Sequence, residues 1–525
     1  MSAHEKPNCF PPAVVASLIE IARSGHDLFI ETSEQLDAAL RLQMHRQIQL
    51  VRRVYDLSPF GGNYNISNWS CCINACCCET TIIKGAGPDG PDFLRLGSGY
   101  KQVSIDRVGF DGWNHVVKLD GQTKHDRIDV TNSCVRNSNV GVGQRSSGAG
   151  AGVENPPNAL VGLDRLSVLN THFENLTGMA VHILADGLVT PANVPGRRGA
   201  WIKHFNVSGN SIDGISSTNT ALGFAVAALP ANRPDDEIRL DDRSMLHWGA
   251  NSIYNVRGVS NTESDAIRAS GAVNTTMVGN VAVDCDGTGF YSRQSSRAVQ
   301  VGNIAFRCDQ YGLQSKATKG LVMSASISEE SGLDGVEIIN DMQDVVFTSV
   351  AITKSGRRAM TLANISRGVI ESTVTHDNTT NGGDQRGTIF VRNCDDLRFD
   401  GLNIVETAPM PLINITVDFA SEHIAISDSN LMNSVFLSHV VELEFVTSAN
   451  SGPPVVPGTL DTFLVSGLEA EELTNSFVRR ISGNDPTNAT YEGNRSGGTT
   501  VVPAYSQAGG FVTFPNPGDV VSDNA

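Results

Sequence analysis

Ala266-Ile267-Arg268-Ala269 is the first of five related stretches in the middle of the chain. The others are Gly289-Phe290-Tyr291-Ser292, Gly312-Leu313-Gln314-Ser315, Gly335-Val336-Glu337-Ile338 and Ala359-Met360-Thr361-Leu362. Successive stretches begin 23 residues apart, and the last step is 24. A small residue followed by apolar side chains at alternate positions is typical of a half-buried β-strand. A fixed period of this length indicates a solenoid, in which each repeat packs on its neighbours.

A second pattern consists of two short apolar-alternating segments separated by two turn residues. Its clearest copies are Val103/Ile105/Val108/Phe110, Val299/Val301/Ile304/Phe306, Val345/Phe347/Val350/Ile352 and Leu397/Phe399/Leu402/Ile404. The turn often contains Asn or Asp, at Asp106, Asn132, Asn170, Asn280, Asn303, Asp400 and Asp428. These residues tolerate the left-handed backbone conformation and bond to their own backbone. The pattern therefore predicts two strands joined by a tight corner.

Together these repeats resemble the pectate-lyase-like β-helix superfamily, in which three strands per coil stack into three parallel sheets. The resemblance covers roughly Thr80 to Asn433. It implies an all-β fold, a single-stranded right-handed parallel β-helix with about 23 residues per coil. That fold carries lyases, hydrolases, epimerases and virus tailspikes, so it says little about activity.

Three regions are expected along the chain. Residues 1–50 form an N-terminal segment with a capping helix, whose N-cap is expected to be Ser33 and which runs to about Met44. In this superfamily such a helix commonly covers the first coil, whose apolar side chains and strand edge would otherwise be exposed. Residues 51–450 form the β-helix, and residues 451–525 form C-terminal strands and an extended tail. Insertions are expected at residues 141–158, 186–199, 221–243 and 377–386.

The composition limits the classes of partner. Lys and Arg number 39 against 56 Asp and Glu, for a net charge of −17. A general nucleic-acid binder is normally basic, so no nucleic-acid partner is expected. No apolar segment is long enough to span a bilayer. The apolar stretch from Pro11 to Ala22 is not expected to be a Sec signal, because Glu20 interrupts it and no basic segment precedes it. We therefore expect no membrane partner.

Half of the ten cysteines lie in one short segment, at Cys71, Cys72, Cys76, Cys77 and Cys78. Their spacing is irregular, and no second ligand pair follows as zinc sites require. We expect them to be small buried hydrophobic residues, with metal binding and disulfides as the alternatives. No cofactor or metal is predicted.

The superfamily's catalytic patterns are missing. Trp201-Ile202-Lys203-His204 is similar to a Trp-Ile-Asp-His run of pectate lyases. Lys203 stands in place of the acidic residue, however, and a cation cannot hold calcium. This run is therefore expected to be a surface loop that enters a strand.

The 23-residue register predicts a ladder of outward side chains. Arg268, Tyr291, Gln314 and Glu337 would form one column, with Arg293 and Lys316 beside it. Aromatic rings stack on sugars, and guanidinium groups bind carboxylates. The ladder therefore predicts a substrate-binding face for an anionic polysaccharide. An ordinary solvated sheet surface is the alternative.

Glycosidic hydrolysis requires two carboxyl groups at a defined separation. The candidates near the ladder are Glu263 and Asp265, and Asp241 and Asp242 lie in a preceding acidic segment. His247 is a further candidate acid or base. A segment this acidic is also typical of a soluble loop.

Among proteins with this fold, the chain looks most like a phage tailspike. The resemblance implies a homotrimeric virion protein that binds a bacterial surface polysaccharide. Cleavage of that polysaccharide is a second expectation. The N-terminal segment would then contact virion tail or capsid proteins, after synthesis in the host cytoplasm. The alternatives are a free polysaccharide lyase or hydrolase, secreted by a non-Sec route, and a non-enzymatic structural protein of the virion. The sequence leaves open whether the chain is a polysaccharide depolymerase.

Overall fold

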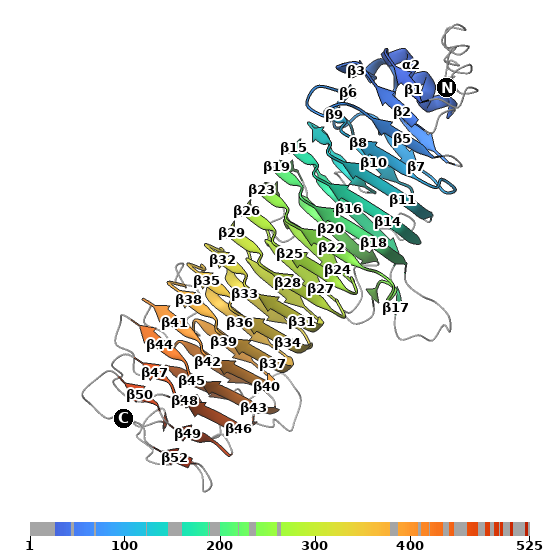
Figure 1. Ribbon diagram of the computed structural model, residues 1–525. Coiled ribbons are helices and arrows are strands. Elements are labelled where there is room, and N and C mark those ends of the chain that lie inside the picture. Colours follow the sequence, from blue (N-terminus) through green and yellow to red (C-terminus); the bar gives the residue numbers. More distant parts are fainter. Residues whose placement is uncertain are drawn as a thin grey trace, which may run out of the picture. The chain divides into compact units, whose positions relative to one another are not determined.

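The structure is a computed structural model of the full chain. It describes residues 27–43, 47–67, 70–121, 123–144, 160–186, 188–189, 200–218, 220–229, 238–259, 264–378, 387–407, 411–418, 420–433, 440–445, 459–470, 478–482, 488–492, 494–496, 505–507 and 520–522. Within these residues the fold is almost entirely β (Figure 1). It divides into two compact units, Met1–Ser264 and Asp265–Ala525.

The first unit contains three parallel sheets, named here A1, B1 and C1. Sheet A1 is formed by β1 (Leu28–Ile30), β2 (Gln47–Leu50), β5 (Cys71–Asn74), β8 (Val103–Asp106), β11 (Lys124–Thr131), β14 (Gly162–Leu169), β18 (Trp201–Ser208) and β22 (Leu246–Gly249). Sheet B1 is formed by β3 (Val54–Asp56), β6 (Ile82–Lys84), β9 (Gly109–Asp111), β12 (Cys134–Arg136), β15 (His172–Leu176), β19 (Ser211–Ser217) and β23 (Ser252–Gly258). Sheet C1 is formed by β4 (Tyr64–Ile66), β7 (Leu94–Leu96), β10 (His115–Leu119), β13 (Val140–Gly143), β16 (Met179–Asp186) and β20 (Leu222–Leu229). The unit also contains the helix α2 (Ser33–Leu42), the 3-10 turn η1 (Ser58–Phe60) and an antiparallel pair, β17 (Leu188–Val189) and β21 (Ile238–Arg239).

The second unit also contains three parallel sheets, named A2, B2 and C2. Sheet A2 is formed by β25 (Thr275–Val278), β28 (Ala298–Val301), β31 (Lys319–Ser324), β34 (Met342–Thr348), β37 (Ile365–Glu371), β40 (Asp395–Asp400), β43 (Ala420–Ser427), β46 (Thr459–Ser466), β49 (Thr490–Glu492) and β52 (Val520–Ser522). Sheet B2 is formed by β26 (Val281–Cys285), β29 (Ile304–Cys308), β32 (Ile327–Glu329), β35 (Ala351–Thr353), β38 (Val374–His376), β41 (Asn403–Glu406), β44 (Asn430–Asn433), β47 (Glu469–Ala470) and β50 (Arg495–Ser496). Sheet C2 is formed by β24 (Ile267–Ser270), β27 (Phe290–Arg293), β30 (Leu313–Lys316), β33 (Asp334–Ile339), β36 (Arg358–Ala363), β39 (Ile389–Arg392), β42 (Ile413–Val417), β45 (Val441–Phe445), β48 (Val478–Ser482) and β51 (Tyr505–Gln507). Three parallel sheets per unit are consistent with a parallel β-helix.

The pairing register differs between the units. In sheet C2, Ile267 pairs with Phe290, and Phe290 pairs with Leu313, at steps of 23 residues. In sheet A1, Ile128 pairs with Leu166, and Leu166 pairs with Phe205, at steps of 38 and 39. One period therefore does not describe the first unit, where longer connections join the strands. The insertion predicted at residues 221–243 was wrong for its first part, because Leu222–Leu229 is the strand β20, paired with β16.

The corners use left-handed residues, as the Asx pattern suggests, but not always at the predicted residue. Asn132, Asn170 and Asp428 have φ of 49°, 50° and 47°. At two other corners the left-handed residue is a glycine, and the following Asn280 and Asn303 are fully buried. The Asn303 Oδ1 accepts from the backbone N and the Nδ2 of Asn280, at 3.1 and 3.0 Å. These asparagines therefore satisfy backbone polarity inside the second unit.

One buried carboxyl group lies in the second unit. Glu406 is the last residue of β41, and its two carboxylate oxygens accept from the backbone N and the Nδ2 of Asn378, at 2.8 and 3.0 Å. Burial raises the pKa of Glu406 to about 7, against a partly opposing effect of the Asn378 donors. The interior therefore favours the neutral acid.

The helix α2 begins one residue earlier than its predicted cap implies. Its N-cap is Thr32, whose hydroxyl accepts from the Gln35 backbone N, while Gln35 Oε1 accepts in return from Thr32 N. This capping box satisfies the first free amides of the helix. The helix ends at Leu42, and its Asp37 accepts a 2.7 Å hydrogen bond from Tyr64 on β4.

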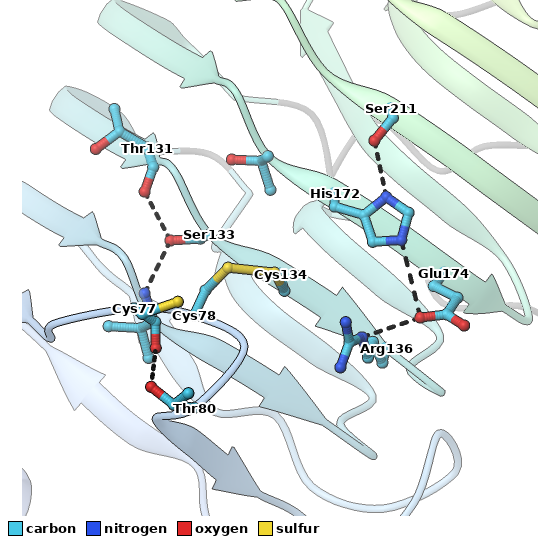
Figure 2. The surroundings of a disulfide bond; sticks show 12 residues. Cys77, Cys78, Thr80, Thr131, Ser133, Cys134, Arg136, His172, Glu174 and Ser211 are labelled. Atoms are coloured by element: carbon cyan, nitrogen blue, oxygen red, sulfur yellow. Dashed lines mark hydrogen bonds and ion pairs between the residues drawn. A yellow bond between two sulfur atoms is a disulfide. The ribbon is translucent and has the colours of Figure 1, made fainter. Parts of the chain in front are cut away.

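The cysteine segment was only partly as expected. Cys71 is buried, but Cys76 is exposed, and Cys78 forms a disulfide with Cys134 on β12. Figure 2 shows this bond beside Ser133, whose hydroxyl donates to the backbone oxygen of Thr131. The disulfide joins positions 56 residues apart, a pairing that sequence alone did not indicate.

None of the helices in the described residues is both long enough and apolar enough to cross a membrane.

Candidate functional site

The first predicted column lies on four consecutive strands of sheet C2. Arg268 pairs with Tyr291, Tyr291 with Gln314, and Gln314 with Glu337. Paired residues on neighbouring parallel strands point to the same side of a sheet. The structure therefore brings these four side chains into one row on β24, β27, β30 and β33.

The second predicted column lies beside the first. Arg293 on β27 pairs with Lys316 on β30, two residues after the first column on each strand. All six predicted binding residues are thus on neighbouring strands of one sheet.

The exposure of the first column differs from that of a flat, solvated face. Tyr291, Gln314 and Glu337 are all buried. The Arg268 guanidinium lies over the Tyr291 ring, 5.3 Å from its centroid. A cation in this position covers the ring and is itself stabilised by it. Tyr291 therefore does not offer a free face to a sugar.

Glu337 is the centre of the contacts on this face. Its side chain is 7% exposed, and its Oε2 lies 3.3 Å from Lys316 Nζ and accepts from Gln314 Nε2. Its Oε1 lies 4.0 Å from Arg357 Nη2. A carboxylate so nearly buried requires partners of this kind.

Tyr311 adds a hydroxyl group to the same cluster. It bonds to Glu337, and burial, reinforced by the Glu337 charge, raises the pKa of Tyr311 above its usual range. The Lys316 ammonium lies 5.9 Å from the centroid of its ring. The phenol is therefore held in its protonated form beside a carboxylate and a cation.

Arg357 connects this cluster to a second carboxylate. Its Nε and Nη2 lie 2.7 and 2.6 Å from the two oxygens of Asp334. Asp334 is fully buried and also accepts from the Thr361 hydroxyl at 2.7 Å. These contacts raise the pKa of Arg357. The two-pronged ion pair fixes the guanidinium, whose side chain remains 30% exposed.

A further cation follows on the next strand. Arg358 Nη1 donates to the Thr361 hydroxyl at 3.1 Å, and its guanidinium lies 4.3 Å from the Phe390 ring centroid. On β24, β27, β30, β33 and β36 and in the residues just before them, the charged side chains are the cations Arg268, Arg293, Lys316, Arg357 and Arg358 and the anions Asp265, Asp334 and Glu337. Cations exceed anions here although the whole chain carries −17. A local excess of this sign attracts anionic ligands.

Sequence reasoning missed Tyr311, Asp334, Arg357 and Arg358. For three of them, the position in the sequence repeat could have indicated the site. Tyr311, Asp334 and Arg358 each directly precede the small residue that opens a repeat, at Gly312, Gly335 and Ala359. Asp334 and Arg358 are in fact paired in the sheet. Extending the repeat by one position would have identified this column.

The predicted catalytic carboxylates have other partners. Asp265 is buried, and its Oδ1 accepts from the Thr288 backbone N at 2.9 Å while its Oδ2 lies 3.7 Å from Arg268 Nη1. It is the first residue of the second unit. These contacts suit a group that positions Arg268.

Asp241 and Asp242 lie in the first unit. Asp241 accepts from Arg243 Nε at 2.7 Å, and Asp242 is exposed. His247 is half-buried on β22, and burial lowers its pKa. Glu263 lies outside the described residues. In the part of the chain that the structure describes, no three His, Cys, Asp or Glu side chains gather as a metal site would require.

Comparisons with known proteins give distant likenesses only. No protein-family model and no curated protein matches the chain. Among solved structures, the A-module of a mannuronan C-5 epimerase from Azotobacter vinelandii aligns over 77% of this chain and 91% of its own, with 13% identity and a TM-score of 0.42. A periplasmic alginate epimerase aligns over 94% and 100%, with 10% identity and a TM-score of 0.37. A DFA-IIIase from Arthrobacter chlorophenolicus aligns over 89% and 95%, with 11% identity and a TM-score of 0.31. Likenesses this distant do not indicate what this chain binds or does.

Proposed function

We propose that the outward face of sheet C2 binds an acidic polysaccharide. The observation that carries this proposal is the contact set around Glu337, where Lys316 and Arg357 are held on one face with Arg268 and Arg293 on the neighbouring strands. Guanidinium and ammonium groups fixed in place lose little entropy on binding carboxylates. A repeating polymer suits a face whose cations recur from strand to strand.

Isothermal titration calorimetry of the full chain with polygalacturonate tests this proposal. Lys316→Gln removes one cation and should weaken binding about tenfold. The matched control is Lys354→Gln, because Lys354 is paired with Glu329 and Glu330 and lies outside sheet C2. Equal affinity of all three proteins, or no binding by the wild type to any acidic polysaccharide, would refute the proposal.

Cleavage of the polymer is a further part of the proposal. Tyr311 and Glu337 are adjacent titratable groups that contact Lys316, and proton transfer by such a pair is what lyase or hydrolase chemistry requires. The sequence candidates Asp241, Asp242, Glu263 and Asp265 remain the alternative set. A fall in polymer viscosity that persists in Glu337→Gln but is lost in Asp265→Asn would favour the alternative.

The tailspike-like role belongs to this proposal as well. It includes a homotrimer, location in a virion, and contact of the N-terminal segment with tail or capsid proteins. Light scattering of the full chain tests the trimer directly, and a monomer would remove this part of the proposal. The genes beside this one test the virion assignment.

Two features of the fold are proposed with it. The first is that α2 covers the N-terminal end of the solenoid, supported by buried Leu36, Ala39 and Leu40 and by the Asp37–Tyr64 bond. The second is a coil of about 23 residues as the basic repeat, which the register of β24, β27 and β30 supports.

A further inference from the structure

Two arginines and a histidine occupy one row on the outward face of sheet A1. Arg127 on β11 pairs with Arg165 on β14, and Arg165 pairs with His204 on β18. All three side chains are exposed, and those of Arg127 and Arg165 are each 45% exposed. Like charges directly opposite each other on neighbouring strands are destabilising. The arrangement therefore calls for a compensating group.

Four consecutive strands of the second unit fill this position differently. Arg127 and Arg165 directly precede the first of two buried inward residues on their strands. On β34, β37, β40 and β43 an acidic residue is followed each time by a basic or histidine residue at that position: Asp344, Arg367, Asp396 and His423. Arg367 Nε lies 2.7 Å from Asp344, and His423 Nδ1 lies 2.9 Å from Asp396. The two adjacent arginines of sheet A1 thus differ from the oppositely charged pair that Asp344 and Arg367 form at this position.

One buried carboxylate holds the two arginines side by side. Asp129 Oδ2 accepts from Arg127 Nε, and its Oδ1 lies 3.3 Å from Arg165 Nε. Arg165 Nε also donates to the Ser167 hydroxyl at 3.0 Å. Every one of these contacts uses Nε, and among the described residues neither arginine makes a hydrogen bond through Nη. Within the described residues, these four Nη groups are the part of the arginine row that a ligand would contact.

The other carboxylates nearby are already engaged. Lys124 Nζ lies 3.2 Å from Asp126 and 3.0 Å from Asp164, and Lys203 Nζ lies 2.8 Å from Asp164. Partial burial alone would raise the pKa of Asp164, but the hydrogen bonds from Lys203 and Lys124 outweigh this effect and lower it to about 2. Asp126 and Asp164 therefore neutralise lysines. Among the described residues, Asp129 is the carboxylate that is paired with Arg127 and Arg165.

We propose that Arg127 and Arg165 together bind a single oxyanion group, a sulfate ester or a carboxylate, carried by a carbohydrate. Two guanidinium forks on neighbouring strands suit one oxyanion, which would relieve the repulsion between them. A nucleic acid fits less well, because the chain carries −17 and the adjacent Trp201 ring is covered by Arg243, 5.0 Å from its centroid. The site lies in the first unit and does not rest on the proposed function of sheet C2.

Arginine footprinting of the wild-type full chain measures directly whether a ligand protects Arg127 and Arg165 from modification. Phenylglyoxal modification is followed by peptide mass spectrometry, with sucrose octasulfate as the sulfate ligand, trigalacturonate as the carboxylate ligand and neutral sucrose as the blank. At saturation by the preferred ligand, modification of Arg127 and Arg165 should slow about tenfold. Arg367 is the matched control, because it is exposed on a sheet strand and already paired with Asp344, and its rate should not change.

The variant Arg165→Gln provides the second measurement. It retains Arg127 and Asp129, so it tests whether both forks are needed, and the ligand concentration that protects Arg127 should rise about tenfold. Unchanged protection of Arg127 in this variant would overturn the paired site. So would equal slowing of Arg367, or no slowing with either ligand. Stronger protection by a single-stranded oligonucleotide would overturn the carbohydrate assignment. None of these outcomes depends on Lys316, so failure here is distinguishable from failure of the sheet C2 proposal.

Discussion

Lys316 Nζ lies 3.3 Å from Glu337 Oε2, diagonally across two neighbouring strands of sheet C2. The register explains this contact, because Gln314 pairs with Glu337 and Lys316 stands two residues further along β30. A lysine that is 25% exposed is thereby fixed above a carboxylate that is nearly buried. Through this pair, Lys316 of the second column is connected to Gln314 and Glu337 of the first column.

The ion pair between Arg357 and Asp334 should contribute to stability. Arg357→Gln leaves Asp334 fully buried without its two-pronged partner. Because Arg357 is partly exposed, we expect a loss of about 2 kcal/mol in the free energy of unfolding, below the usual cost for a fully buried pair. Denaturant unfolding followed by circular dichroism measures it.

Arg367→Gln is the control for this prediction. It breaks a pair of similar geometry whose two side chains are exposed, so stability should not change measurably. Equal destabilisation by both substitutions would show that burial of Asp334 is not the cause.

Stability should fall as pH rises through the pKa of Glu406. The folded state holds this pKa at about 7, against an ordinary value of 4.5. The neutral acid is therefore stabilised fully below pH 4.5, and this contribution is lost as pH rises through about 7. Its size is about 3 kcal/mol from the shift in pKa. Melting temperatures of the wild type should fall between pH 5 and pH 8 by more than those of Glu406→Gln.

The same pH comparison has a control in Glu329→Gln, which removes a partly exposed carboxylate from β32. Its melting temperatures should follow the wild type at both pH values. A pH dependence that is identical in Glu406→Gln and the wild type would contradict the assignment.

The disulfide between Cys78 and Cys134 should stabilise the first unit. It closes a loop of 56 residues, for which the loss of unfolded-state entropy amounts to about 4 kcal/mol. A reductant should lower the melting temperature of the wild type and leave Cys134→Ser unaffected. Cys76→Ser, at an exposed free cysteine, should respond to reductant as the wild type does. Peptide mapping without reductant that finds no link between Cys78 and Cys134 would reject the pairing.

The strands of sheet C2 could be predicted from sequence because alternation and a fixed step determine which residues stack. Arg268, Tyr291, Gln314 and Glu337 therefore fell into one row. Their burial could not be predicted, because it depends on long side chains such as Arg268 folding back over the row.

Other features depend on contacts that no local pattern encodes. Asn280 and Asn303 carry the residue type of a corner, yet they are turned inward because a preceding glycine adopts the left-handed conformation. The Cys78–Cys134 pairing joins a turn to a distant strand. Arg357 was missed because it lies in a corner, outside the alternating segment.

The most direct test of the central claim is lysine footprinting of the full chain by acetylation, with and without polygalacturonate. If the outward face of sheet C2 binds the polymer, acetylation of Lys316 should slow about tenfold, while Lys354, paired with Glu329 and Glu330, should react at an unchanged rate. Equal rates for Lys316 with and without saturating polymer, at a concentration where calorimetry shows binding, would contradict the claim.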